Sequence, residues 1–194
     1  SPIICEESVN PIQEISLLIG RLDSLIEGEE TVERLVRCGP PAIPLLGAFL
    51  LEGRPRKIFQ PRRWAVEALA RLGAKNILLE YLFLPKDVAD PEDRFGEEAV
   101  ESAAARFLSA WPDDDMFQRL LELSENHMLI GLIETLADYR RAEAMPYFER
   151  ALEDDYYRLA AKNAFVKMGA LSRETLVSSA ITPKPHSSSE TPSS

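Results

Sequence analysis

The sequence predicts an all-α protein built from stacked pairs of antiparallel helices. Good helix formers such as Ala, Leu, Glu and Arg dominate the 194 residues, whereas β-branched runs with the two-residue alternation of strands are almost absent. A hydrophobic content of 45% with 28% charged residues is typical of a globular protein. Helical segments that share one pattern at repeat-sized intervals predict that neighbouring pairs stack into a continuous core.

Five helical segments align on one apolar residue, which we call position zero, at intervals of about 29 to 38 residues. The next residue and the third residue after it are apolar, and the second is polar. Because unrelated amphipathic helices share a period but not a common stop, a glycine four residues after position zero indicates tandem repeats. Position zero is Leu35, Leu69, Phe107, Leu136 and Phe165; the fourth residue after it is Gly39, Gly73, Trp111, Arg140 and Gly169.

The first helix is predicted to begin at Asn10, an N-cap residue followed by proline at the first helical position. Its apolar face includes Leu25 and Ile26, and Gly28 is expected to end it. A second helix then runs to Gly39. We expect a preceding extension over residues 1–9.

Later helices are predicted over 98–111, 129–139 and 156–168, and a short turn joins each one to an antiparallel partner that follows it. Insertions at 53–60 and 85–95 account for the unequal spacing of the repeats. The predicted repeat domain spans 10–181. A Ser- and Pro-rich tail over 182–194, nearly free of apolar side chains, is expected to be disordered.

Charge and composition limit the classes of function and partner that fit this chain. A formal net charge of -10 argues against nucleic-acid binding, which requires clustered Lys and Arg, and favours a basic or neutral partner. Cys5 and Cys38 provide neither a disulfide framework nor the spacing of metal ligands. Because no apolar run is long enough to span a membrane and no secretory leader opens the chain, we expect a cytoplasmic protein.

Four stretches resemble a known family, the short bacterial HEAT repeats of the phycobilisome-lyase type. The family pattern has an Arg seven residues before position zero and a Gly four residues after it. Arg62 and Arg158 match the Arg position, whereas the other copies carry Gly28, Val100 and Leu129 there. The matching stretches are AIPLL at 42–46, PRRWAVEALARLG at 61–73, AMPYF at 144–148 and YYRLAAKNAFVKMG at 156–169.

This resemblance implies a right-handed α-solenoid, or α-α superhelix, of about five HEAT-like helix pairs that serves as a binding scaffold. A minority of the family attach or detach bilin chromophores or repair alkylated DNA. No catalytic residue, metal ligand or cofactor site can be assigned from the resemblance.

The densest cluster of cations in this acidic chain lies in and after the 53–60 insertion. Together with Phe59, these side chains could hold an acidic peptide or a phosphate. The alternative is a solvated loop, with Arg62 bonded to neighbouring repeats as in the family. The cations are Arg54, Arg56, Lys57, Arg62 and Arg63.

A second candidate surface is a ladder of residues two positions before and after position zero, which share one exposed face and would align along a groove. The alternative is that Glu33 with Arg37, and Glu67 with Arg71, form only i,i+4 pairs on a solvated face. The ladder comprises Glu33, Arg37, Glu67, Arg71, Ala105, Ser109, Glu134, Asp138, Asn163 and Lys167.

The acidic runs and the two histidines are best interpreted as structural rather than functional residues. The acidic runs 113–115 and 153–155 precede predicted helices, where the helix dipole stabilises carboxylates. His127 and His186 have no Cys, Ser or His at the spacing of a zinc or nucleophilic site.

The leading hypothesis is a non-catalytic scaffold or adaptor that binds another protein through a concave groove and the 53–60 loop. The rival from another class is a bilin-lyase-like enzyme subunit. Two further readings are a toxin-neutralising immunity protein, which the negative charge favours, and a HEAT-like DNA repair protein, which it disfavours.

Overall fold

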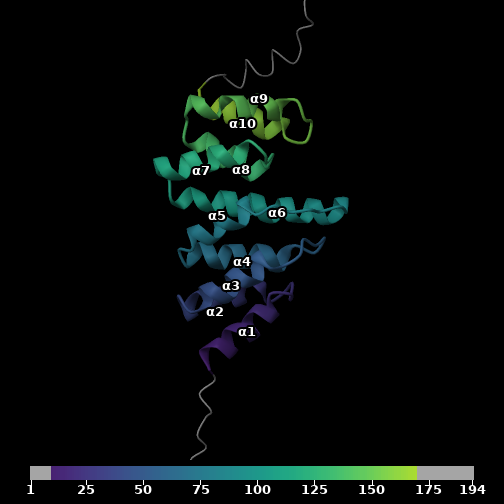
Figure 1. The fold of residues 1–194 in the computed structure, drawn as a ribbon, viewed down its shortest axis with the longest axis vertical. Helices are drawn as coiled ribbons and strands as arrows, with labels where there is room; N and C mark the ends of the chain where they lie inside the picture. The colour runs from purple at the N-terminus through teal and green to yellow at the C-terminus, as the bar shows by residue number, and fades with distance from the viewer. Residues whose placement is uncertain (1–9, 170–194) are drawn as a thin grey trace, which may run out of the picture.

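A computed structural model describes residues 10–169, and these form ten α-helices and two short 3-10 helices without any strand. This confirms the all-α prediction for the described part of the chain. Successive pairs of helices follow one another in chain order along the long axis of the molecule (Figure 1). Predictions for 1–9 and for the chain beyond 169, including Cys5, His186 and the tail, lie outside the described residues.

The α-helices are α1 (Pro11–Arg21), α2 (Gly28–Cys38), α3 (Ala42–Leu51), α4 (Gln60–Arg71), α5 (Lys75–Phe83), α6 (Pro91–Phe107), α7 (Asp114–Ser124), α8 (Ile130–Asp138), α9 (Met145–Leu152) and α10 (Arg158–Lys167). The 3-10 helices are η1 (Leu108–Ala110) and η2 (Ala142–Ala144). In the described part of the chain, no helix combines the length and the apolar character needed to cross a membrane.

Helices with even numbers form a continuous row in which α2 contacts α4, α4 contacts α6, α6 contacts α8 and α8 contacts α10. We call this the even row. Each even helix also packs against the odd-numbered helix before it in the chain, giving five successive pairs from α1–α2 to α9–α10. We predicted that each even helix pairs with the helix that follows it; the more extensive contacts are with the helix that precedes it.

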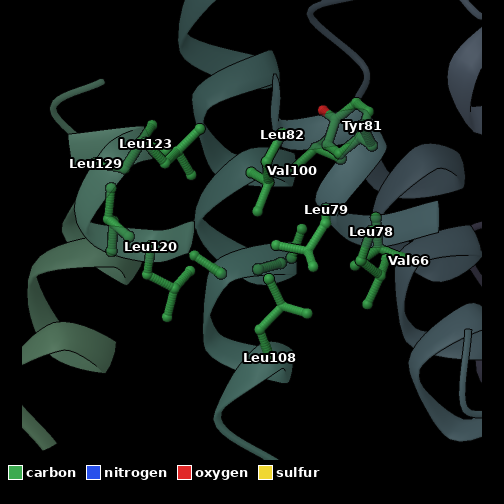
Figure 2. Packing of buried hydrophobic residues seen from close by; sticks show 14 of the residues in the cluster. Val66, Leu78, Leu79, Tyr81, Leu82, Val100, Leu108, Leu120, Leu123 and Leu129 are labelled. Atoms are coloured by element: carbon green, nitrogen blue, oxygen red, sulfur yellow. The ribbon is translucent and has the colours of Figure 1, made fainter. Parts of the chain in front are cut away.

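The core is continuous from pair to pair because apolar side chains of four successive helices interdigitate. Figure 2 shows Val66 of α4, Leu78 of α5, Val100 of α6 and Leu120 of α7, all of them fully buried. The position-zero residues also lie inside, except Phe107, which is only half-buried. Neighbouring pairs therefore supply the apolar surface that one pair alone cannot bury.

The predicted helix stops are confirmed at the level of backbone conformation. Gly39, Gly73 and Gly169 have φ values of 73°, 80° and 71°, in the left-handed region where glycine has no Cβ clash. Arg140 lacks that freedom, yet it takes the same conformation with φ 53°. Trp111 is the exception, because the helix before it ends through the 3-10 turn η1.

The predicted end of the first helix is wrong. Helix α1 ends at Arg21, and Gly28 instead begins α2. A Cβ at Gly28 would overlap the indole of Trp64, so glycine is needed here for the close approach of α2 and α4. Leu25 and Ile26 lie in the connection between the helices, with 76% and 95% of their surfaces exposed.

The third even helix begins earlier than predicted. Residues 91–95, assigned to an insertion, are the first turn of α6, and Asp90 caps it by accepting hydrogen bonds from the backbone N–H groups of Glu92 and Asp93 at 2.8 and 3.1 Å. Asp followed by Pro and Glu is an N-terminal signal that the apolar periodicity does not reveal.

Gly131 tests how closely α6 and α8 must approach. A Cβ at this position would overlap the backbone of Ser102, so Gly131→Ala should lower the free energy of unfolding by about 2–3 kcal/mol. Gly20→Ala is the matched control, because a Cβ there meets nothing and alanine should raise helix stability by up to about 1 kcal/mol. Urea denaturation followed by circular dichroism measures both, and equal effects would contradict the prediction.

Candidate functional site

The predicted ladder lies along the even row, and its charges pair between neighbouring helices. The guanidinium of Arg71 on α4 binds the carboxylate of Glu33 on α2 at 2.5 and 3.1 Å. Lys167 on α10 likewise pairs with Asp138 on α8. The alternative of i,i+4 pairing is wrong for Arg71, whereas Glu67 does form such a pair, with Arg63 at 3.7 Å.

Between α6 and α8 the prediction misplaces the ladder by one residue. Ala105, expected on the exposed face, is fully buried, and its carbonyl accepts a hydrogen bond from Thr135 Oγ1 at 3.1 Å. Arg106 instead supplies the charge at this level and binds Glu134 at 2.7 Å. The close approach of α8 through Gly131 covers the position that helical periodicity alone would expose.

The remaining ladder residues are exposed: Arg37 on α2, Asn163 on α10 and Ser109 on the 3-10 helix η1 that follows α6. The hydrogen bonds from Arg71 lower the pKa of Glu33 below its ordinary value. Because the Arg71–Glu33 and Arg106–Glu134 ion pairs are exposed to solvent, they contribute little to the free energy of unfolding.

The 53–60 loop is anchored to the start of α6 rather than free in solvent. The backbone N–H of Lys57 donates to Asp93 Oδ1 at 2.8 Å, and its Nζ lies 3.0 Å from Glu92. Gly96 allows this contact, because a Cβ there would overlap the carbonyl oxygen of Arg56. Thus the loop backbone is fixed, while the side chains of Arg54 and Arg56 are exposed.

Phe59 and Arg63 of the predicted site line a cleft of about 220 Å³ that opens beside the even row. We call it the aromatic cleft. Its other walls come from α6, from the start of α8 and from residues before α10, which lie far apart in the sequence. The lining is completed by Phe95, Glu98, Ala99, Ser102, Arg106, Leu129, Ile130, Tyr156 and Tyr157.

Sequence reasoning missed the aromatic side chains of this cleft. Phe95 falls in the predicted insertion over 85–95. The helix predicted over 156–168 includes Tyr156 and Tyr157, but α10 begins only at Arg158. The sequence gives no signal for them, because their exposure is a property of the folded structure: Phe95 and Tyr156 have 57% and 53% of their surfaces accessible, which is unusual for large aromatic residues.

Arg62, one of the cations in and after the 53–60 insertion, has a structural role, as the alternative to a binding role for these cations proposed. Its guanidinium is buried and binds both carboxylate oxygens of Glu97 at 2.9 and 3.3 Å, and it donates to the carbonyl of Leu50 at 3.0 Å. Tyr81 donates its hydroxyl hydrogen to the same carboxylate. This network links α3, α4, α5 and α6.

The second arginine that matches the family pattern makes a corresponding contact. Arg158 Nε donates to the carbonyl of Leu152 at the end of α9, at 3.0 Å. Both arginines therefore satisfy a carbonyl at the C-terminal end of the preceding helix, where no intrahelical partner is available.

A second cluster of polar side chains, Lys86, Glu101 and His127, lies next to the network around Arg62 and Glu97. Lys86 Nζ is 3.5 Å from Glu101, and His127 Nε2 is 4.0 Å from the same carboxylate. Burial raises the pKa of Glu101 to about 7, an effect that Lys86 opposes and Glu97 reinforces. Burial lowers the pKa of both Lys86 and His127.

The predicted structural role of the acidic runs is confirmed where hydrogen bonds are present. Asp113 caps α7 by accepting from the N–H of Met116 at 2.7 Å, and Asp154 accepts from the N–H of Tyr156 at 2.9 Å. Over residues 10–169, no three His, Cys, Asp or Glu side chains converge in a geometry that could hold a metal ion.

Comparison with known protein families, with characterised proteins and with solved structures gives no match.

Arg62 and Glu97 should each be needed for stability mainly because the other is buried beside it. Arg62→Met leaves Glu97 charged and buried without its partner, so this variant, like Glu97→Met, should lose about 3–5 kcal/mol of unfolding free energy. The double variant should lose much less than the sum of the two. Urea denaturation measures the three values, and Arg71→Met, which breaks an exposed pair, is the control expected to change little.

If a single variant fails to fold, the double variant still decides. A cooperative unfolding transition for the double variant supports the coupling. A double variant that also fails to fold would contradict it, as would additive losses where both single variants can be measured.

Glu101 should make stability depend on pH. Its pKa is about 7 in the folded protein against an ordinary value of 4.5, so the folded state keeps a proton that the unfolded chain has released. The free energy of unfolding should therefore fall by about 3 kcal/mol as pH rises from 4.5 to 8. Glu101→Gln should remove this fall, and exposed Glu30→Gln should not; identical profiles for wild type and Glu101→Gln would refute the assignment.

Proposed function

We propose that this protein is a non-catalytic scaffold that binds another protein along the even row and the adjoining 53–60 loop. The observation that carries the proposal is the aromatic cleft, in which exposed Phe95 and Tyr156 lie beside a continuous row of helices. Exposed aromatic side chains in a cleft are typical of protein interaction sites. Arg54 and Arg56 extend this surface from a loop whose backbone is already fixed.

We further propose that the helices form a right-handed α-solenoid of HEAT-like pairs, with the even row on its concave side. Two observations support this reading. A residue with positive φ ends four of the five even helices at the same repeat position. In addition, Arg62 and Arg158 each bind a carbonyl at the end of the helix before them.

The partner we propose is a protein encountered in the cytoplasm, with a basic segment for the acidic body of this chain and an acidic segment that contacts Arg54 and Arg56 of the 53–60 loop. The net charge of -10 favours such a partner through electrostatic complementarity and disfavours nucleic acid. A toxin neutralised by an immunity protein would be one such partner. The bilin-lyase-like and DNA-repair alternatives have no particular observation in their favour.

Capture from a lysate of the source organism tests this proposal. Arg54→Glu with Arg56→Glu changes the charge of the loop without touching its anchoring residue Lys57. The matched control, Arg21→Glu with Arg119→Glu, makes the same change of charge on exposed sites of α1 and α7, outside the even row. We expect a protein that the wild type and the control retain and that the loop variant loses.

With that partner purified, the Kd should rise at least tenfold for the loop variant and stay within about twofold for the control. A partner retained equally by both variants would remove the 53–60 loop from the surface. The absence of any specific partner, or an absorbance change on mixing with a bilin, would overturn the scaffold proposal.

A further inference from the structure

The aromatic cleft is lined by rings from three separate segments. Phe95 of α6 and Tyr156 before α10 meet edge to face with 6.5 Å between ring centroids, and Tyr156 contacts Tyr157 in the same way at 4.9 Å. Phe59, before α4, completes the aromatic wall. At about 220 Å³ the cleft is smaller than the roughly 300 Å³ at which drug-sized ligand sites begin, so its size suits a single side chain.

Glu98 places a carboxylate in this cleft without a matching cation. It is half-buried, and among residues 10–169 no Lys, Arg or His lies within ion-pair distance of it. Burial raises its pKa, Arg94 opposes this effect and the charge of Asp154 adds to it. Burial also raises the pKa of Tyr157 to about 12, and Glu98 is the next cause.

The two cations that line the cleft already have partners. Arg63 lies 3.7 Å from Glu67 and its guanidinium is 5.6 Å from the centre of the Trp64 ring system. Arg106 binds Glu134 at 2.7 Å. The uncompensated charge in the cleft is therefore negative.

We propose that the aromatic cleft takes the side chain of a lysine or arginine from the protein partner. The cationic head group binds the carboxylate of Glu98, and the aliphatic stem packs on Phe95, Tyr156 and Tyr157. This inference rests on the proposed function, and it names the residue type by which the partner is anchored.

Three chemical arguments favour this occupant. The faces of Tyr and Phe rings attract a cation and also pack against methylene groups, so they suit a long cationic side chain. An anionic side chain would be repelled by Glu98 and Asp154. A purely apolar side chain would cover Glu98 without supplying a partner, which leaves a carboxylate desolvated and unpaired.

Short peptides test the cleft directly. The probes are acetyl-Gly-Gly-X-Gly-Gly-amide with Lys, Arg, norleucine or Glu at X, titrated into the full chain while the ring resonances of Tyr156 and Tyr157 are followed by NMR. We expect saturable shifts with Lys and Arg and none with norleucine or Glu. Equal affinity for the norleucine peptide would overturn the inference, because norleucine keeps the stem without the charge.

Two variants test the named side chains. Glu98→Gln keeps the shape of the side chain and should weaken binding of the Lys peptide at least tenfold; exposed Glu30→Gln is the matched control and should leave it unchanged. Tyr156→Leu keeps an apolar wall but removes the ring, and should weaken binding several-fold. Unchanged affinity for Glu98→Gln would refute the proposed head-group contact.

These outcomes separate the cleft from the scaffold proposal. Peptide binding that depends on Glu98, together with no captured partner, supports the cleft and overturns the scaffold. A captured partner that binds Glu98→Gln as tightly as wild type supports the scaffold and overturns the cleft.

Discussion

The buried ion pair between Arg62 and Glu97 is the interaction on which the middle of the molecule depends. Removing two charges from water is costly, and the cost is offset because the carbonyl of Leu50 and the hydroxyl of Tyr81 complete the hydrogen bonding. The pair fixes the rotation of α6 about its axis. Because the side chain of Glu97 is buried, the directions in which the residues on either side of it point are determined. Gly96 faces the backbone of the 53–60 loop, and Glu98 reaches the aromatic cleft.

The features that the sequence predicts well are those decided within one helix. Burial at position zero and the stop four residues later both follow from the helical period and from the conformation at the helix end. Arg140 shows that the helix stop requires a backbone conformation rather than a glycine, since it takes a positive φ despite its Cβ. The same local reasoning identifies Asn10 as a cap residue, and its side chain accepts the expected backbone hydrogen bond.

Features decided by a neighbouring helix could not be predicted in this way. Gly28 reads as a helix stop because the residue that requires its small size, Trp64, is 36 positions away. Ala105 reads as exposed because nothing local announces that α8 covers it. The aromatic cleft is the extreme case, since its walls come from segments that the periodicity of each helix treats separately.

The ladder and the cleft differ in what binding would require of them. Each exposed ladder pair, such as Arg71 with Glu33, is already satisfied in the free protein, so a partner gains from it only by replacing one good contact with another. Such pairs mainly orient an approaching charged surface. Glu98 has no such pair to break, and aromatic rings with exposed faces surround it. Anchoring is therefore expected in the cleft, where new contacts replace only water, and the ladder serves to favour one orientation of the partner along the row.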